Sequence, residues 1–369
     1  MKLALVHDQL QEFGGAERVL IALHTIFPNA PVYTAFYNED SLKKNVPDYK
    51  DWKINVSWAH YIPLFKKLYS PLRFLAPAIW ESFDFKDFDV VLSSSGWYMC
   101  KGIKVKKPTI HVSYLHHPPR YLYGYETAVE WQKYWPVKIY ASVVNHFLRQ
   151  WDYSSSQHVD HFIANSEETK RRIEKFYRKD SKVLYPPVSI PPKATSYKFQ
   201  ATSYYVTVSR LARAKHIDLL IQTANEYKFN LKIVGSGRDL DYLRSIAGGT
   251  VEFITDASDE KRNKLIADAK AFLFASVDEE FGIAPVEAMG FGTPVIAYAS
   301  GGLKETINEY VNGFLFNRLS TEAVQSSIKK LESLSDEKYL EMRKKSRKES
   351  EQYSFENFKT NLLSFVNSL

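Results

Sequence analysis

The sequence predicts an α/β fold built from two doubly wound domains, each with a parallel sheet. Short apolar runs of strand length alternate with amphipathic runs of helix length, which is the pattern of such sheets. The length of 369 residues favours two domains. A proline-rich stretch without periodicity, 186–200, separates the halves, so we expect domains at 1–187 and 188–352. Two such domains would face each other across a deep cleft.

Composition limits the partners and the compartment. The formal net charge of +7 favours an anionic partner such as nucleic acid, acidic lipid or phosphate. A single cysteine, Cys100, excludes an intrachain disulfide framework and suits a reducing compartment. The run Met1–Asp8 is too short for a secretory signal, and no stretch approaches the ~18 apolar residues of a membrane span. We therefore expect a cytoplasmic protein.

Two features of the first half are candidate parts of a binding site. The first predicted strand is followed by a loop with Gly14 and Gly15, after which an apolar helical repeat starts at Ala16. This arrangement suits a phosphate, although a plain turn fits equally well. His116 follows a later strand, at the end where parallel sheets bind ligands, although a lone histidine is more often structural. The predicted strands are Leu3–His7, Asp89–Ser93, Thr109–Tyr114, Val159–Ala164 and Lys182–Tyr185, with a helix at Tyr134–Tyr153.

Two basic segments of the first half have different interpretations. Trp52–Trp80 interleaves aromatic and aliphatic residues with lysine and arginine, and it contains no acidic residue. Such a segment can lie in a membrane interface, and its prolines limit any helix to short pieces. The plain alternative is a domain face that packs its apolar side inward. Lys101, Lys104, Lys106 and Lys107 crowd a connection between two strands, which is typical of a solvated turn.

One strand-to-helix transition in the second half contains two carboxylates. Glu279 is expected in the loop, and Glu287 in the first turn of a helix that Pro285 would open. Gly282 lets a ligand approach the backbone, and free N–H groups at the helix start would favour an anion. The strands predicted here are Tyr204–Val208, Leu231–Val234, Val251–Ile254, Ala271–Phe274 and Val295–Tyr298; the helices are Ile217–Tyr227, Leu240–Ala247, Glu260–Ala269, Asp336–Glu351 and Ser354–Leu369.

Cations and glycines follow the neighbouring strands of the second half. Arg210 and Lys215 come after Tyr204–Val208 and could clamp a diphosphate, and Gly235 comes after the next strand. Hydroxyl-binding carboxylates beside phosphate-binding loops fit a nucleotide sugar. The chain has no cysteine cluster and no helical His-x-x-x-His pair, so we expect no metal. The absence of Gly-x-Gly-x-x-Gly argues against a dinucleotide dehydrogenase.

These motifs together resemble one enzyme family. The run from Glu279 to Glu287, with Phe281-Gly282 inside it and Gly290 to Val295 after it, is similar to the signature of family 4 retaining glycosyltransferases. The resemblance covers nearly the whole chain and implies the GT-B fold of two Rossmann-like domains, with a helix at 353–369 that crosses back to the first domain. Other matching motifs are Gly14-Gly15-Ala16-Glu17-Arg18, Ser209-Arg210 with Lys215, and Gly235-Ser236-Gly237.

The resemblance also implies roles. Glu279 would hold the hexose hydroxyls, Glu287 the ribose, and His116 would lie near the transferred sugar. The implied reaction retains the anomeric configuration, needs no metal, and passes the acceptor's proton to the donor phosphate. Glu280 departs from the glycine that many members have. Residues implied to bind the donor are Arg210, Lys215, Glu287, Phe281, Gly282, Ile283, Ala284, Gly235, Gly14 and Gly15.

The favoured function is transfer of mannose from GDP-mannose to a lipid-linked or glycan acceptor in polysaccharide or glycolipid synthesis. Similarity around His116 and at 160–166 to mannosyltransferases of surface-polysaccharide assembly favours this donor. A UDP-hexose donor, or a nucleotide-sugar epimerase of the same fold, is the alternative. We expect contact with the cytoplasmic face of a membrane through Trp52–Trp80. Binding of nucleic acid is not expected, because no recognised reader motif occurs.

Overall fold

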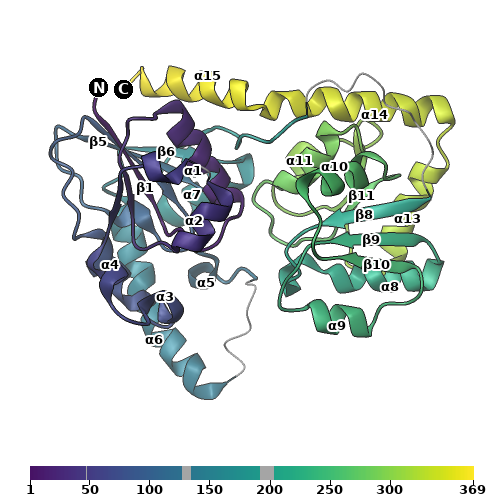
Figure 1. Cartoon of the computed structure of the whole chain (residues 1–369), viewed down its shortest axis with the longest axis horizontal. Helices are drawn as coiled ribbons and strands as arrows, with labels where there is room; N and C mark the ends of the chain where they lie inside the picture. The colour runs from purple at the N-terminus through teal and green to yellow at the C-terminus, as the bar shows by residue number, and fades with distance from the viewer. Residues whose placement is uncertain (47, 127–133, 192–202) are drawn as a thin grey trace. The chain divides into compact units, whose positions relative to one another are not determined.

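A computed structural model describes residues 1–46, 48–126, 134–191 and 203–369 (Figure 1). The described chain divides into two compact units. The amino-terminal unit holds residues 1–125, 134–187 and 358–369, and the carboxy-terminal unit holds residue 126 with 188–191 and 203–357. Each unit is built on one parallel sheet flanked by helices, which confirms the predicted fold class. The expected linker, 186–200, lies mostly outside the described residues.

The amino-terminal unit has a seven-stranded sheet in the order β3-β2-β1-β4-β5-β6-β7. All of its strand pairs are parallel. The strand order reverses between β1 and β4, and such a switch point is where open α/β sheets bind ligands. The strands are β1 Leu3–His7, β2 Val32–Thr34, β3 Ile54–Val56, β4 Val90–Ser95, β5 Ile110–Leu115, β6 His161–Ala164 and β7 Ser181–Val183.

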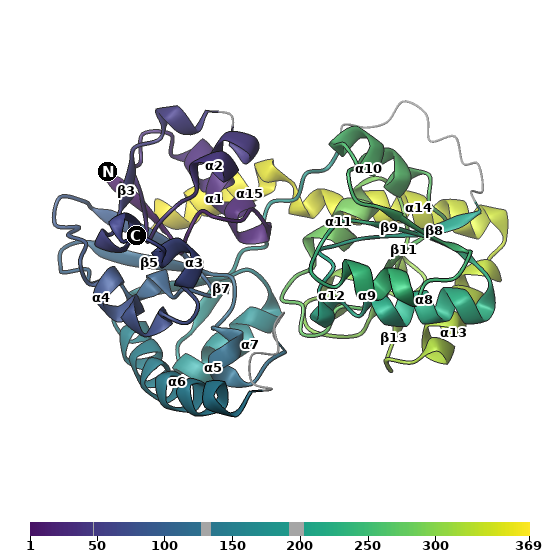
Figure 2. The same ribbon diagram turned by 60° about the horizontal axis from the view of Figure 1, so that its bottom comes forward.

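Helices cover both faces of this sheet, with α1 and α15 on one side and α6 and α7 on the other (Figure 2). From Phe358 onward, α15 belongs to this unit, where the Phe358 ring packs edge-on against Tyr114 of β5. The helices are α1 Gly15–Ile26, α2 Glu39–Asn45, α3 Phe65–Leu68, α4 Ala76–Trp80, α5 Arg120–Tyr123, α6 Trp135–Ser156, α7 Glu167–Tyr177 and α15 Phe355–Val366, with 3₁₀ turns at Tyr49–Asp51, Trp58–Tyr61, Arg73–Leu75 and Cys100–Gly102.

The carboxy-terminal unit has a six-stranded sheet in the order β10-β9-β8-β11-β12-β13. Its pairs are again all parallel, and the order reverses between β8 and β11. The carboxyl ends of β8 and β11 therefore flank the expected ligand position. The strands are β8 Tyr204–Val208, β9 Asn230–Val234, β10 Val251–Ile254, β11 Phe272–Phe274, β12 Val295–Tyr298 and β13 Gly313–Phe316.

Two helical layers enclose this second sheet. Figure 2 shows α8, α9 and α13 on one face and α10, α11 and α14 on the other. The helices are α8 Ile217–Tyr227, α9 Leu240–Ser245, α10 Asp259–Ala267, α11 Ile283–Gly290, α12 Leu303–Thr306, α13 Thr321–Glu332 and α14 Asp336–Ser350, with 3₁₀ turns at Arg213–Lys215 and Glu351–Tyr353.

The elements that the sequence patterns missed include β2, β3, β13 and α13. The strands β2 and β3 have only three residues each, too few to show a period. They form because a neighbouring strand supplies an edge to pair with: β1 for β2, and β2 for β3. The strand β13 opens with Gly313, a residue that usually weakens a strand. Here glycine is required, because a Cβ at this position would overlap the carbonyl oxygen of Val295 on β12.

The carboxy-terminal unit continues to Asn357, past the boundary at residue 352 expected from the sequence. Tyr353 explains the difference. Its ring packs edge-on against Phe281, and its carbonyl oxygen accepts a 2.8 Å hydrogen bond from the N–H of Val188. Both contacts are within this unit, so the chain leaves it only after Tyr353.

The prediction of a solvated turn was wrong for Lys101, whose side chain is fully buried. Its Nζ lies 2.7 Å from Oδ1 of Asp152 in α6 and 2.9 Å from the carbonyl oxygen of the same residue. The neighbouring Lys104 is exposed and meets Glu81 in a surface ion pair. A buried lysine needs a counter-charge, and Asp152 comes from a helix far along the chain, so composition alone could not locate it.

Candidate functional site

Four loops of the carboxy-terminal unit meet at the carboxyl edge of its sheet. They follow β8, β9, β11 and β12, and backbone hydrogen bonds join them to one another. The N–H of Leu211 donates to the carbonyl oxygen of Ser236 at 2.9 Å, and the N–H of Val277 donates to that of Ala214 at 3.1 Å. The convergence of loops that the sequence predicted is therefore present, and its centre is the switch point between β8 and β11.

Glycines allow these loops to pack so closely. Gly235 has φ +139°, and a Cβ there would overlap the carbonyl oxygen of Ser209 in the neighbouring loop. Gly301 has φ +54°, and its Cβ would overlap the carbonyl oxygen of Glu279. Both the conformation and the space exclude a side chain. The glycines thus bring main chain against main chain and hold Glu279 in place.

A lysine, a serine and a glutamate form the polar centre of this edge. Lys215 Nζ lies 2.5 Å from Oε2 of Glu279. Ser276 Oγ donates to the same oxygen at 2.7 Å and lies 3.2 Å from Lys215 Nζ. Both charged side chains are partly exposed, at 25% for Lys215 and 18% for Glu279. Two donors on one carboxylate oxygen fix the orientation of Glu279 while leaving the pair accessible to a ligand.

The helix that follows begins two residues earlier than expected. Gly282, at φ +88°, is the N-cap of α11, so Pro285 is its third residue rather than its first. Glu287 consequently lies in the second turn, and it is buried. The prolyl ring still fits, because N–H groups of the first turn have no partner within a helix. The N–H groups of Ile283 and Ala284 are positioned to serve an external anion.

Other predicted residues of this unit lie around the same edge. Arg210 is exposed on the loop after β8, and Phe281 is buried at the start of α11. Glu280, which stands where many members of the resembling family have glycine, is buried. Its carbonyl oxygen lies where a Cβ at Gly302 would be. Asp278 adopts φ +54°, and its N–H donates to Ser300 Oγ at 2.9 Å. Asp tolerates that left-handed conformation better than most residues.

A second cluster lies at the carboxyl edge of the amino-terminal sheet. Asp8, directly after β1, accepts three backbone hydrogen bonds from the loop that follows β4. Its Oδ2 takes the N–H groups of Gly96 at 2.9 Å and Tyr98 at 2.8 Å, and its Oδ1 takes that of Cys100 at 2.8 Å. The carboxylate thus holds three N–H groups of this loop in place, so the switch point between β1 and β4 is rigid.

His116 is joined to the Gly14 loop by a chain of side chains. His116 Nε2 lies 2.8 Å from Ser94 Oγ, and Ser94 Oγ lies 3.0 Å from His7 Nδ1. His7 Nε2 is 3.5 Å from Oε1 of Glu17, whose Oε2 accepts the N–H of Gly14 at 2.8 Å. Burial raises the pKa of Glu17, but the neighbouring His7 and the backbone N–H groups outweigh it and lower the pKa. Glu17 is thus held as a carboxylate.

The structure brings the predicted residues of this unit into one network and adds others. His116 is at the carboxyl end of β5, as expected, and Gly14 is the N-cap of α1 with Gly15 as its first residue. His7 and Ser94 were missed. Both are the kind of polar residue at a strand's carboxyl end that singled out His116, so the same reasoning would have found them.

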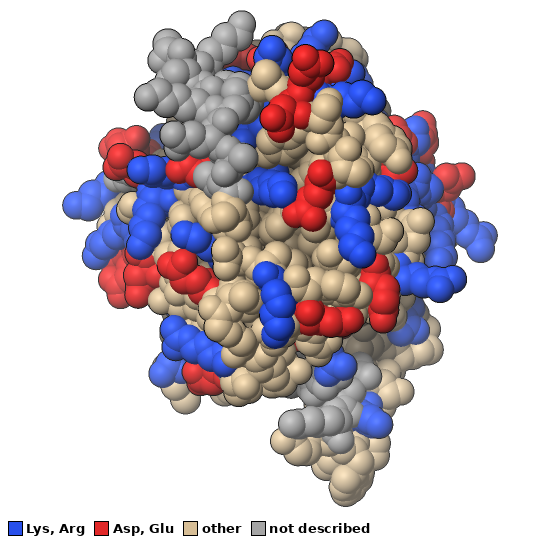
Figure 3. Space-filling view, turned by 90° about the vertical axis from the view of Figure 1, so that its right-hand side faces the viewer, with Lys and Arg blue, Asp and Glu red and all other residues tan. Residues whose placement is uncertain are grey.

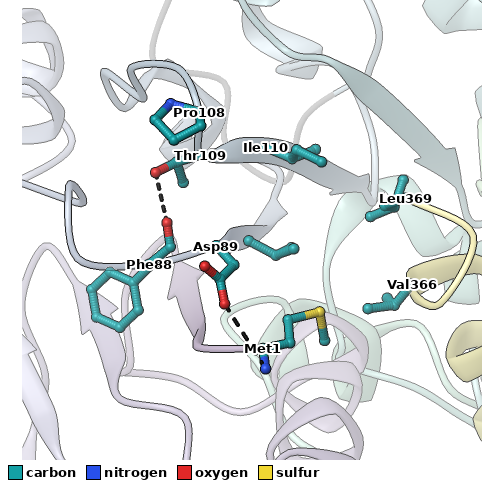
Figure 4. Close-up of a pocket in the computed structure, with 9 residues that line it drawn as sticks. Met1, Phe88, Asp89, Pro108, Thr109, Ile110, Val366 and Leu369 are labelled. Atoms are coloured by element: carbon teal, nitrogen blue, oxygen red, sulfur yellow. Dashed lines mark hydrogen bonds and ion pairs between the residues drawn. The ribbon is translucent and has the colours of Figure 1, made fainter.

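A cavity of about 380 Å³ opens at the opposite, amino edge of the same sheet. Figure 4 shows Phe88, Asp89, Thr109 and Ile110 at the starts of β4 and β5 around it, with Leu369 from the carboxyl end of the chain. Parallel sheets bind ligands at their carboxyl edge, so this cavity is not part of the candidate site.

Among the residues described here, no group of three or more His, Cys, Asp or Glu side chains could hold a metal ion. Within the same parts of the chain, no helix is both long enough and apolar enough to cross a membrane. On the face drawn in Figure 3, lysines and arginines alternate with carboxylates and form no continuous basic surface.

Comparison with known proteins connects these two clusters with one class of enzyme. Residues 13–190 match the family described as Glycosyltransferase Family 4, and residues 194–349 match Glycosyl transferases group 1. The crystal structure of Anabaena Alr3699/HepE in complex with UDP and glucose has a TM-score of 0.71 at 18% identity and covers 100% of both chains, which shows a shared GT-B fold.

Two curated relatives match shorter parts of the chain. Glycogen synthase of Mycoplasma mobile is 34% identical over 143 residues, which are 34% of this chain and 30% of the relative. Alpha-1,3/1,6-mannosyltransferase ALG2 of Kluyveromyces lactis is 26% identical over 203 residues, 41% of this chain and 40% of the relative. This chain thus spans well under two thirds of either relative. The two family models together cover most of it, and the chain belongs to the GT-B glycosyltransferases, with a Family 4 amino-terminal half and a group 1 carboxy-terminal half.

Proposed function

We propose that this chain transfers a hexose from a nucleotide diphosphate sugar to a lipid-linked or glycan acceptor, with retention at the anomeric carbon. The family of both halves supports glycosyl transfer. The observation that carries the proposal is the group of Lys215, Ser276 and Glu279 at the switch point of the carboxy-terminal sheet. Lys215 can bind phosphate and the adjacent Glu279 can bind hydroxyls. A nucleotide diphosphate sugar carries both kinds of group.

Different residues of the carboxy-terminal cluster bind different parts of the donor. Lys215 and Arg210 bind the diphosphate and stabilise the negative charge that develops as the bond to the sugar breaks. Glu279 accepts hydrogen bonds from the hexose hydroxyls, and its fixed carboxylate selects their arrangement. Glu287 binds the ribose hydroxyls. The N–H groups of Ile283 and Ala284, at the positive end of α11, contact the phosphate and the sugar.

The amino-terminal cluster serves the transferred sugar and the acceptor. His116 contacts the sugar, and the loop of Gly14 and Gly15 admits phosphate and acceptor close to the backbone. The acceptor oxygen forms a bond to C1 while the bond from C1 to the phosphate oxygen breaks. The acceptor's proton passes to the donor phosphate on the same face. The chain's contribution is positioning and stabilisation of the leaving group, so no metal is required.

The donor proposed first is GDP-mannose, with the cytoplasmic face of a membrane as the place of reaction. A mannosyltransferase among the relatives supports mannose. The second candidate is a UDP-hexose, because a protein of the same fold was crystallised with UDP and glucose. Thermal shifts with GDP- and UDP-sugars separate the two, since a ligand that binds only the folded state raises the melting temperature. A protein that converts a UDP-sugar to its epimer without an acceptor would instead be the epimerase.

The variant Glu279→Ala tests the assigned site. Removing a group that acts on the transition state costs about 10²–10³ in kcat. With the nucleotide sugar that raises the melting temperature, we expect kcat of Glu279→Ala to fall by this factor. Ser276→Ala removes only one of the donors to the carboxylate, so its kcat should fall about tenfold. NMR of the product's anomeric proton reports retention. Near-normal transfer by Glu279→Ala would refute the role of this carboxylate.

A further inference from the structure

The helix α6 exposes large apolar side chains on its outer face. They recur at every fourth position, which places them along one side of the helix. Trp135 is 73% exposed and Phe147 is 64% exposed. The exposed side chains are Trp135, Ile139, Val143 and Phe147, while the buried face carries Ala141, Asn145, Leu148 and Asp152. A surface helix normally turns its polar face outward, so this arrangement is inverted.

A second group of exposed apolar side chains comes from α3 and from the loop and 3₁₀ turns on either side of it. The sequence expected this basic segment, Trp52–Trp80, either to contact lipid or to pack inward. The structure divides it: Phe65, Ile79 and Trp80 are buried in the core. The exposed members are Tyr61 at 76%, Leu64 at 64%, Trp58, Ile62, Leu68 and Phe74.

The two groups are parts of one region of the amino-terminal unit. Arg73, beside Phe74, donates from Nη2 to Asn145 Oδ1 of α6 at 3.0 Å. Its guanidinium also lies 5.3 Å from the ring centroid of Tyr140, whose hydroxyl donates to the carbonyl oxygen of Pro71. The segment is therefore fastened to α6 at two positions, Tyr140 and Asn145. The first turns of α6 project beyond the rest of this unit in Figure 1.

The charges of this region have one sign. The segment Trp52–Trp80 has no Asp or Glu, and the one acidic residue of α6, Asp152, is fully buried against Lys101. Lys67 and Lys138 are exposed among the apolar side chains. A face that is apolar, includes Trp and Tyr, and is cationic without carboxylates is complementary to the surface of an anionic membrane.

We propose that this α3–α6 surface, made of Tyr61, Ile62, Leu64, Leu68 and Phe74 with Trp135, Ile139, Val143 and Phe147, docks on an anionic lipid membrane. The apolar side chains enter the headgroup boundary, and Lys67 and Lys138 meet the lipid phosphates. A second copy of the chain is a poorer occupant, because two such faces would bring lysines against lysines. The surface does not include the donor cluster. The inference rests on the membrane location in the proposed function and deepens it by naming the surface that meets the lipid.

Sedimentation with vesicles tests the surface directly. The full chain is mixed with vesicles of phosphatidylcholine alone or with phosphatidylglycerol added. We expect binding to the anionic vesicles that weakens at high salt, because screening removes the attraction of the lysines. The double variant Trp135→Ser/Phe147→Ser should bind at least about tenfold more weakly, since two large apolar groups no longer enter the membrane. Lys67→Ala and Lys138→Ala should each lose about fivefold on anionic vesicles.

A matched control comes from the other unit. Tyr242 on α9 is 55% exposed, so Tyr242→Ser removes a similar surface aromatic without touching the α3–α6 surface. It should bind vesicles like the unchanged protein. Melting temperature and its shift with the nucleotide sugar should stay the same in every variant, which separates lost docking from lost folding and from failure of the proposed reaction. Three results would overturn the proposal. The full chain does not bind anionic vesicles at low salt, or the double variant binds them like the unchanged protein, or the unchanged protein is a dimer and the double variant is a monomer.

Discussion

Replacing Lys101 by methionine is expected to destabilise the amino-terminal unit strongly. Lys101 Nζ is bonded to Oδ1 and the carbonyl oxygen of Asp152 and to Ser155 Oγ, at 2.7, 2.9 and 3.3 Å. The other carboxylate oxygen of Asp152 accepts the hydroxyls of Tyr123 at 2.7 Å and Tyr177 at 2.8 Å. Burial, followed by the Asp152 charge, raises the pKa of both tyrosines, so both hydroxyls stay protonated as donors.

The magnitude follows from burial. Both members of the Lys101–Asp152 pair have no exposed surface. In Lys101→Met the carboxylate keeps its two tyrosine donors but loses its only bonded cation among the described residues. Breaking a buried ion pair by removing one partner costs about 3–5 kcal/mol. For a unit of this size that corresponds to a fall in melting temperature of roughly 10 °C.

Urea unfolding, followed by tryptophan fluorescence and by circular dichroism, measures the effect. Lys104→Met is the matched control on the same loop, because its exposed pair with Glu81 should contribute less than about 1 kcal/mol. The double variant Lys101→Met/Asp152→Asn, which buries no charge, should lose less than Lys101→Met alone. If Lys101→Met costs no more than Lys104→Met, the account of a buried unpaired charge is wrong.

Two further predictions concern pH and the glycine loops. Burial lowers the pKa of His111 to about 3, whereas an unfolded histidine titrates near 6.5. Between these values only the unfolded chain gains the proton, so the free energy of unfolding should fall by about 1.4 kcal/mol per pH unit as the pH decreases, and unfolding curves of His111→Gln should show a shallower slope from pH 6 to pH 4. Gly235→Ala should weaken the thermal shift with the donor and cost at least about 1 kcal/mol, because of its φ and the overlap with Ser209. Gly249→Ala, where a Cβ meets nothing within 4 Å, should leave both unchanged.

Much of the fold could be predicted because strand length and helical period are local properties. The bounds of β1, β8, β10, β12 and α8 agree with the prediction to the residue. The short strands β2 and β3 could not be predicted, because they are not determined locally. They depend on a neighbouring strand for their hydrogen bonds, and three residues are too few to show a period.

For the candidate site, the sequence likewise predicted where the residues lie but not which contacts they make. Parallel strands place their following loops at one edge, so His116 and the loops of Lys215 and Glu279 could be located from chain order alone. Their contacts could not. The bond from Lys215 to Glu279 joins residues 64 apart in sequence, and its length depends on how two loops pack. The path from His116 through Ser94 to His7 likewise needs three strands in register.

For this protein the sequence by itself determined the order of elements, the two parallel sheets and the loops that carry the candidate site, since each follows from local period and chain direction. Only the tertiary structure decided which side of an element is inside. In α6 the bulky apolar face of Trp135 and Phe147 points to solvent, and the face with Asn145 and Asp152 points inward. The physical reason is that Arg73 and Lys101, from distant segments, donate hydrogen bonds to Asn145 and Asp152. Burying these two side chains therefore costs less free energy than burying them without partners.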